Sequence, residues 1–584
     1  ATGAAAQTGT QLFRNARVFD GDRVLASTDV LVRAGRIAEI GRGLAAPAGA
    51  QVINAAGKTL LPGLIDAHTH AWGDALREAL AFGVTSELDM FTDAQLARTL
   101  RAEQSAGSGL GRADLFSAGI LVTAPGGHGT EYGMTIPTLA TPDAAQAFVD
   151  ARIAEGSDYI KIVYDDGAVY GLKFATLSRA TMRAVIAAAH KRGKLAVVHV
   201  GSAAGALAAL QEGADGLVHL FTNELPTADF AALARTRNVF VVPTLTVLKS
   251  VTGEPGAAGL IKDERLAPYM APATRAGLER AFPARAGTRN YQVAVETVRR
   301  LNAAGVPILA GTDAPNPGTA HGVALHRELE LLVQAGLSPL QALASATSVP
   351  ARAFNLRDRG RIAVGLRADL LLVNGDPTTD ITTTRAIDGV WKLGVPMDRA
   401  AFAAEVKAAL TAAAAPLKSV SASLISDFET GSTSARFGTE WMVNTDSYAG
   451  GKSTGEQKVT AEGAQQSRGA LSITGTVSDA LPYAWSGTMW SPGAQPMTPA
   501  NLSSTRELRF WTRGDGATYR AMVFAQSKGM MPLEQTFVAG PVWREIVIPW
   551  SAYGIHAHDL MAVIFAAGPK AGSFQFQVDN ISIR

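Results

Sequence analysis

The chain has 584 residues, 47% of them hydrophobic and 18% charged, which indicates a globular protein with a large core and excludes a disordered one. Its net charge of +2 argues against nucleic acid or an anionic membrane as a partner. Cysteine is absent, which excludes disulfides, thiolate metal ligands and a cysteine nucleophile.

Residues 1–10 are small and polar, and we expect them to be disordered. The chain starts at Ala1-Thr2-Gly3 without methionine, and no apolar run in it reaches the length of a membrane span. Such a start is typical of a mature chain whose signal peptide was removed, although a shortened chain would look the same. We therefore expect a periplasmic or secreted protein, with a cytoplasmic one as the alternative.

Short alternating stretches separated by turn residues run from residue 11 to about residue 58. This pattern predicts short β-strands. Stretches of the same character return at residues 361–398. We expect the ranges 11–58 and 361–398 to close one composite β-sandwich around the segment between them.

Residues 59–360 alternate short apolar runs with amphipathic stretches, a pattern typical of βα units and a parallel sheet. Helices are expected at residues 74–81, 93–104, 146–155, 179–192 and 203–212, and strands at 84–88, 114–122 and 239–244. Residues 123–138 and 249–287 are too long for plain connections. Insertions of this length are usually lids or specificity loops, so we expect these two to shape a substrate pocket.

Beyond residue 398 the composition changes. Residues 399–423 predict an alanine-rich helix followed by a linker, and residues 424–584 predict a β-sandwich rich in aromatic strands. Its tryptophans could form a platform for sugars, although such residues more often belong to a sandwich core. They are Trp441, Trp485, Trp490, Trp511 and Trp550. A glycan contact by this domain, or packing against the barrel or a partner subunit, stays an alternative.

Two histidines end the first apolar run of the central region, in Leu61-Pro62-Gly63-Leu64-Ile65-Asp66-Ala67-His68-Thr69-His70. Residues two apart on a strand project from the same face, so one strand end can present both imidazoles to one metal. The pair alone is weak, because two histidines also occur together by chance on exposed loops. A second pair, His556 and His558, has no further ligands around it and reads as such a chance pair.

Four later runs each carry a residue that could complete the same site. Lys161 lies inside the apolar run 158–163, where an unpaired ammonium would be costly to bury. His199 and His219 each end an apolar run, and Asp313 ends another beside a glycine. The chain order is therefore His-x-His, Lys, His, His and Asp.

This order of residues resembles the amidohydrolase superfamily of metal-dependent hydrolases over roughly residues 10–400. The resemblance implies an α/β fold, a distorted TIM (β/α)₈ barrel with its site at the carboxyl ends of the strands. It implies a metal ligand set that matches six positions in type and order. These are His68, His70, Lys161, His199, His219 and Asp313.

The resemblance also implies how such a site works. A carbamate formed from CO₂ on Lys161 would bridge two divalent metal ions, with zinc the expected metal for these nitrogen and oxygen donors. A hydroxide between the metals would attack the substrate carbonyl. Asp313 is expected to be the general base that later protonates the leaving nitrogen, although it could also cap a helix before Ala314-Pro315.

Further polar residues near these positions are candidates for substrate contact. His128 lies in the glycine-rich stretch Pro125-Gly126-Gly127-His128-Gly129, and His321 follows the last expected strand of the barrel. Either could hold an oxyanion or be an ordinary loop residue. Tyr164, just beyond Lys161, is a further pocket candidate.

We therefore expect a binuclear hydrolase that cleaves an amide or peptide bond in a small molecule or short peptide. The pattern around Lys161 looks most like prolidase-type dipeptidases and ochratoxin-hydrolysing amidases, and residues 322–343 look like the imidazolonepropionase-like group. Lactone, ester or phosphoester hydrolysis stays an alternative, as does a mononuclear imidazolonase or deaminase-like enzyme. A carbohydrate- or surface-binding protein without activity is the alternative from another class.

The carboxyl-terminal domain resembles the jelly-roll domain named for a complex I intermediate-associated protein, akin to galactose-binding modules. This likeness rests on Asp427-Phe428-Glu429 and on the aromatic strands up to the last one, at residues 574–583. The resemblance implies an all-β domain appended to the hydrolase. A homo-oligomer is a further expectation.

Overall fold

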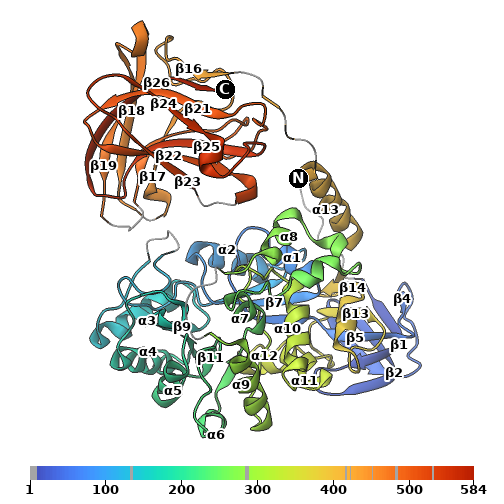
Figure 1. The fold of residues 1–584 in the computed structure, drawn as a ribbon. Helices are drawn as coiled ribbons and strands as arrows, with labels where there is room; N and C mark the ends of the chain where they lie inside the picture. The colour runs from blue at the N-terminus through green and yellow to red at the C-terminus, as the bar shows by residue number, and fades with distance from the viewer. Residues whose placement is uncertain are drawn as a thin grey trace. The chain divides into compact units, whose positions relative to one another are not determined.

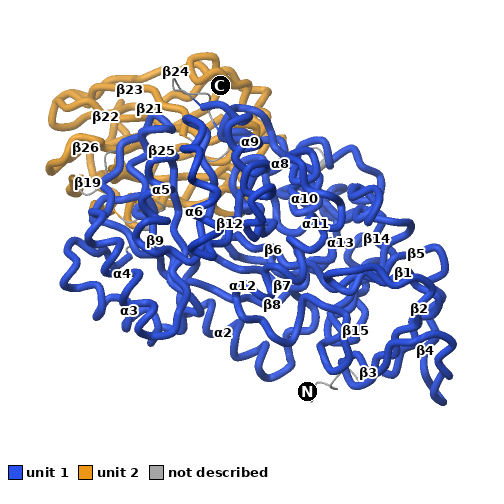
Figure 2. Tube along the Cα trace, turned by 90° about the horizontal axis from the view of Figure 1, so that it is seen from below, with its two compact units in different colours: residues 1–130, 136–413 blue, residues 131–135, 414–584 orange. Residues whose placement is uncertain are grey.

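The computed structural model describes residues 9–131, 136–282, 289–414, 417, 419–420, 423–449, 451–479, 484–528 and 532–584. Residues 1–8, which belong to the stretch expected to be disordered, lie outside the described residues. The same holds for parts of the predicted linker and of both predicted pocket loops. The chain divides into two compact units that meet in sequence at residues 413 and 414, coloured separately in Figure 2.

The first unit contains a parallel barrel of short strands (Figure 1). The strands are β6 (Leu64–Thr69), β7 (Val84–Asp89), β8 (Asp114–Ser117), β9 (Ile160–Tyr164), β10 (Ala196–Val200), β11 (Gly216–Val218) and β12 (Phe240–Val242). Two sheets, β6-β7-β8 and β12-β11-β10-β9, are joined by a bridge between Val122 and Ile162. On the other side, Ile308 bridges Val241 and Ala314 bridges Thr69, so the extended segment 307–314 takes the place of the eighth strand.

Helices follow the barrel strands and cover the barrel from outside, as Figure 1 shows. They are α1 (Ala75–Ala81), α2 (Ala94–Ser105), α3 (Ala145–Ala154), α4 (Arg179–Lys191), α5 (Ala203–Glu212), α6 (Phe230–Thr236), α7 (Leu245–Val251), α8 (Pro272–Glu279), α9 (Tyr291–Ala303), α10 (Val323–Gln334), α11 (Pro339–Ser345) and α12 (Ser348–Ala353). In α4, Ser178 accepts a hydrogen bond from the Thr181 N–H and caps the helix. Met182, Val185 and Ala189 then bury one face at helical spacing.

The five helices predicted for this region begin and end within two residues of the observed ones. Two expectations need correction. The predicted strand 114–122 ends at Ser117, because Gly119 takes a left-handed conformation with a φ of 62° and turns the chain. The predicted loop 249–287 contains α8, which starts with proline and buries Thr274 and Leu278 on one face.

Both ends of the first unit meet in one eight-stranded sheet. Its strands are β1 (Gln11–Phe19), β2 (Val24–Arg33), β3 (Arg36–Gly41), β4 (Gln51–Asn54), β5 (Lys58–Pro62), β13 (Leu370–Asn374), β14 (Ile387–Lys392) and β15 (Val395–Pro396). The order is β15-β14-β13-β5-β1-β2-β3, with β4 beside β1. Leu371 of β13 pairs antiparallel with Leu61 of β5, directly before the first barrel strand. The composite sheet therefore anchors the start of the barrel.

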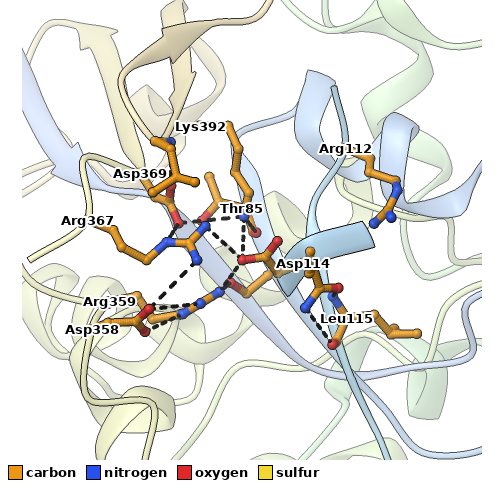
Figure 3. Close-up of polar contacts among 12 residues, drawn as sticks. Thr85, Arg112, Asp114, Leu115, Asp358, Arg359, Arg367, Asp369 and Lys392 are labelled. Carbon is orange, nitrogen blue, oxygen red and sulfur yellow. Dashed lines mark hydrogen bonds and ion pairs between the residues drawn. The ribbon is translucent and has the colours of Figure 1, made fainter. Parts of the chain in front are cut away.

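A buried charge cluster ties this sheet to the amino-terminal ends of β7 and β8 (Figure 3). Asp114 lies at its centre and contacts Arg359 at 2.6 Å, Lys392 at 2.7 Å and Arg367 at 2.8 Å. Burial alone would raise the pKa of Asp114, but the three cations lower it to about 2. Lys392, 1% exposed, also donates to the carbonyl of Thr85.

The first unit ends in α13 (Arg399–Ala414), and the second unit is a two-sheet β-sandwich. One sheet has the order β18-β19-β26-β21-β24 with β16 beside β26, and the other has the order β17-β20-β25-β22-β23. Their bounds are β16 (Leu424–Ser426), β17 (Met442–Thr445), β18 (Thr454–Ala461), β19 (Gly469–Val477), β20 (Ser486–Trp490), β21 (Glu507–Gly514), β22 (Thr518–Ala525), β23 (Leu533–Val538), β24 (Arg544–Pro549), β25 (Leu560–Ala567) and β26 (Gly572–Ile583).

Three of the tryptophans considered for a sugar platform are core residues of this sandwich. Trp441, Trp490 and Trp550 are at most 2% exposed, and Trp441 stacks on Trp490 and on Phe565. Trp485 and Trp511 are half-buried. Among the helices that the structure describes, none combines the length and the apolar character needed to cross a membrane.

Candidate metal centre

Five of the six residues predicted as metal ligands lie at or near the carboxyl ends of the barrel strands, and Lys161 is the second residue of its strand. His68 is in β6 with His70 just beyond it, Lys161 is in β9, and His199 is near the end of β10. His219 directly follows β11, and Asp313 lies near the end of the eighth barrel segment, 307–314. Parallel strands end at the same side of a barrel, so residues distant in the sequence converge there.

Their side chains form one compact group. The donor atoms of His68, His219 and Asp313 lie within 4.8 Å of one another. Asp313 Oδ1 lies 3.0 Å from His70 Nε2 and 3.2 Å from His68 Nε2. The ring of His199 joins the group at a centroid distance of 4.7 Å from that of His219. The structure thus brings the predicted histidines and the aspartate together.

Three buried atoms of this group, both ring nitrogens of His68 and Oδ1 of Asp313, lack a hydrogen bond of normal geometry in the described part of the chain. Unsatisfied polar atoms that are fully buried are costly, and a bound cation would satisfy Oδ1 of Asp313 and one of the two ring nitrogens of His68. Burial lowers the pKa of His68 to about 3 and that of His199 to about 4, so both rings are neutral at pH 7. Neutral imidazole is the form that binds a metal, so the donor set fits a divalent metal such as zinc.

Lys161 is buried within the same group. It is 3% exposed. Its positive charge lowers the pKa of His68 and of His199, and the charge of Asp313 raises the pKa of Lys161 in turn. Burial lowers the pKa of Lys161 to about 7, against the opposite effect of Asp313 and Asp89. A large share of this amine is therefore unprotonated at neutral pH, and the unprotonated amine is the form that reacts with CO₂.

Backbone conformation is unusual at three positions of the site. His219, Asp313 and Thr244 have φ angles of 77°, 60° and 50°, in a region that residues other than glycine rarely adopt. Such conformations cost roughly 1–3 kcal/mol each and persist where the surrounding structure holds them. Their concentration at the ends of three neighbouring barrel strands is typical of a functional site.

Neighbouring groups hold the ligand rings in place. His70 Nδ1 lies 3.2 Å from the carbonyl oxygen of Phe91, and His219 Nδ1 lies 2.8 Å from Thr244 Oγ1. The amides of Leu245 and Thr246, which follow Thr244, donate to the buried carboxylate of Glu328 in α10. The His219 ring is therefore held by a segment that is itself anchored to the outer helices.

Comparison with known proteins identifies the family of the chain. The sequence pattern of the Amidohydrolase family matches residues 59–397, which is more than half of the chain and includes all six ligand positions. The chain belongs to the amidohydrolase family. The pattern of Complex I intermediate-associated protein 30 (CIA30) matches residues 427–558, within the sandwich.

Relatives of this amidohydrolase have several activities. An imidazolonepropionase of Deinococcus radiodurans is 27% identical over 62% of this chain and 89% of its own length. An ochratoxinase of Aspergillus niger is 24% identical over 57% of this chain and 75% of its own. The crystal structure of a putative prolidase from Bifidobacterium longum is 25% identical and superposes with a TM-score of 0.52 over 70% of this chain and all of that one.

Of the three predicted substrate residues of this amidohydrolase, His128 contacts a candidate ligand and His321 contacts a barrel strand. The ring of His128 lies 5.0 Å from that of His199 and 5.3 Å from that of Phe174. His321 is 5% exposed, with Nδ1 3.0 Å from Oε1 of Glu87 on β7. Burial would lower the pKa of His321, but Glu87 outweighs it and raises this pKa. A contact of either histidine with substrate stays a prediction.

The third residue, Tyr164, lies on the other face of β9. Its ring packs into the core between barrel and helices, beside Gly205 at the start of α5. Side chains alternate along a strand, so a residue three positions after the inward-facing Lys161 points outward. The structure therefore does not place Tyr164 among the ligands.

Residues missed by the sequence analysis complete the site. Asp165, four positions after Lys161, is 8% exposed, and its Oδ2 lies 3.2 Å from His199 Nε2. Counting in twos from Lys161 would have found it. Tyr170, in the turn after β9, has its pKa raised by burial and by the charges of Asp165 and Asp313. A lone tyrosine in a loop gives no such signal in the sequence.

Proposed function

We propose that this amidohydrolase is a binuclear metal-dependent hydrolase that cleaves an amide or peptide bond. N-acyl amino acids, dipeptides and ochratoxin-like amides are the substrate classes to test first. The ochratoxinase named above supports an amide bond as the target, since it shares most of its length with this chain.

Lys161 is the observation that carries the binuclear site. A free ammonium buried among three imidazoles and a carboxylate would repel a metal, whereas a carbamate on the same Nζ supplies two anionic oxygens. Two oxygens from one residue suit two metals, and the remaining five donors divide between them. Metals bound there would lower the pKa of a water molecule and polarise the scissile carbonyl.

The residues of the chain then have separate tasks. His68, His70, His199 and His219 hold the metals. Asp313, whose Oδ1 faces the two histidines of the first strand, would take a proton from the attacking water and deliver it to the leaving nitrogen. His128 and His321 would bind the substrate or its oxyanion.

The test compares the wild-type protein with Lys161→Ala, using elemental analysis for metal and a panel of N-acyl amino acids, dipeptides and lactones. We expect two metals per wild-type chain, and loss of metal and activity in the variant with partial recovery by small carboxylic acids. Lys194→Ala, which changes a half-buried lysine two residues before β10, is the matched control and should change neither quantity. Two metals in Lys161→Ala would refute the carbamate bridge.

A mononuclear enzyme is the second candidate, and it is favoured by the likeness to the imidazolonepropionase over most of that protein's length. It predicts one metal per chain and full metal binding in Lys161→Ala. Hydrolysis of lactones without amides in the panel would instead favour a lactonase on the same site.

A further inference from the structure

The carboxylate of Asp165 lies behind the His199 ring. It follows β9 directly, and strand alternation turns it to the same side as Lys161. Its Oδ2 lies 3.2 Å from His199 Nε2, and its Oδ1 accepts a hydrogen bond of 2.9 Å from the Gly167 N–H. Each oxygen therefore has its own partner.

The backbone on the other side lies close to the carboxylate. A Cβ atom placed on Gly201 would lie 2.4 Å from both oxygens of Asp165. Only glycine at position 201 permits this close approach. Asp165 thus lies between the Gly167 amide, the His199 ring and the Gly201 backbone, and its two hydrogen bonds hold it in the observed orientation.

This orientation determines which nitrogen of His199 carries the proton. An ionised carboxylate only accepts hydrogen bonds, so Nε2 must donate, and Nδ1 keeps the lone pair that a metal requires. His219 is held the opposite way round, with Nδ1 on Thr244 Oγ1 and Nε2 3.9 Å from Asp313 Oδ2. A hydroxyl can donate or accept, so Thr244 does not dictate a tautomer as Asp165 does.

We propose that Asp165 is a positioning residue that fixes His199 as an Nδ1 ligand and strengthens its bond to the metal. The inference rests on metal binding by the proposed site. Strand β9 would then contribute to metal binding in two ways. Lys161 would bind the metals directly, and Asp165 would orient the ligand His199 on the neighbouring strand β10. A carboxylate partner also makes the imidazole a stronger donor, because it stabilises positive charge on the ring.

Asp165→Asn separates this role from a structural one. The Gly167 N–H requires an acceptor, so the amide oxygen of asparagine takes the Oδ1 place and the turn is kept. The amide nitrogen then faces His199 Nε2 and donates to it, which moves the ring proton to Nδ1 and blocks the ligand atom. Asp166→Asn is the matched control, because Asp166 is exposed and only caps the Ala168 amide.

The first measurement is the affinity of the metal-free full chain for Zn²⁺, by competition with a chromogenic chelator. We expect Asp165→Asn to bind one metal about 10- to 100-fold more weakly, the usual effect of losing such a partner, and Asp166→Asn to match the wild type. Equal affinity in all three proteins would overturn the inference while leaving the proposed function intact. Weaker binding by Asp166→Asn as well would overturn it too.

The second measurement needs no metal. In ¹⁵N-histidine NMR spectra of the metal-free chain, the signal of His199 is identified by its loss in His199→Gln. We expect a proton on Nε2 in the wild type and on Nδ1 in Asp165→Asn. A wild-type His199 with its proton on Nδ1 would overturn the inference even if the variant failed to fold. A wild type that binds no metal would instead count against the proposed function.

Discussion

The charge cluster at the base of the barrel predicts a large loss of stability from one nearly isosteric substitution. Asp114→Asn keeps the shape of the side chain and removes the charge that Lys392, Arg359 and Arg367 share. Three cations would then be left with the carboxylates of Asp369 and Asp358. Lys392 is 1% exposed, so water cannot compensate for the lost partner.

The size of the effect follows from the pKa of Asp114. Burial raises it, but the cations outweigh burial and bring it from 3.8 to about 2, which corresponds to roughly 2 kcal/mol in favour of the charged carboxylate. Leaving buried cations unpaired costs more, about 3–5 kcal/mol. We therefore expect Asp114→Asn to lower the free energy of unfolding of the barrel unit by about 2–5 kcal/mol.

The assay is urea unfolding of wild type, Asp114→Asn and Asp358→Asn at pH 7. Asp358 belongs to the same cluster, but its side chain is 45% exposed, so its loss should cost about 1 kcal/mol or less. Metal content should not change in either variant, because the cluster lies at the opposite ends of the strands. A loss below about 1 kcal/mol for Asp114→Asn would refute the idea that the cluster fastens the composite sheet to the barrel.

The low pKa of Asp114 also makes the barrel unit sensitive to acid. The stability that the charged Asp114 contributes is present above pH 4 and should be lost as the pH falls toward 2. In acid unfolding, the stability of Asp114→Asn should therefore depend less on pH than that of the wild type. Removal of metal by a chelator should lower the melting temperature of the barrel unit and leave that of the sandwich unchanged. A ligand at 1,000 times its Kd stabilises the protein that binds it by about 4 kcal/mol. Two calorimetric transitions that move together would contradict this prediction. Thr244→Val should free the Nδ1 side of His219 and weaken Zn²⁺ binding about 10-fold in a chelator competition, and an unchanged affinity would show that Thr244 does not hold the ring.

Most residues of the candidate site could be selected from the sequence because they stand at or just beyond the end of a short apolar run. Parallel strands bring their carboxyl ends together whatever the details of packing, so residue type and position along the run were enough for His68, His199, His219 and Asp313. The lysine was visible for a related reason, since an ammonium inside an apolar run needs a special partner. The order of the helices followed from their amphipathic pattern.

The base cluster could not be predicted, because it depends on residues that are distant in the chain. Asp114 meets Arg359 across 245 positions, and Lys392 meets Thr85 across 307. The sequence around each of these residues does not identify its partner. A charged residue near a strand end is equally consistent with a position in solvent.

Tyr164 and Asp165 show where local reasoning falls short even inside a strand that was predicted correctly. Both follow Lys161 closely, and an aromatic residue near a ligand suggests a pocket wall. The alternation of side chains along the strand shows otherwise. It points Tyr164 outward, toward the helices, and Asp165 inward, toward His199. Once one inward-facing residue of a barrel strand is known, its neighbours two and four positions away are the ones to examine. Applied to β7, the same rule places Glu87 and Asp89 together inside the barrel. There Glu87 contacts His321, and the charge of Asp89 raises the pKa of Lys161.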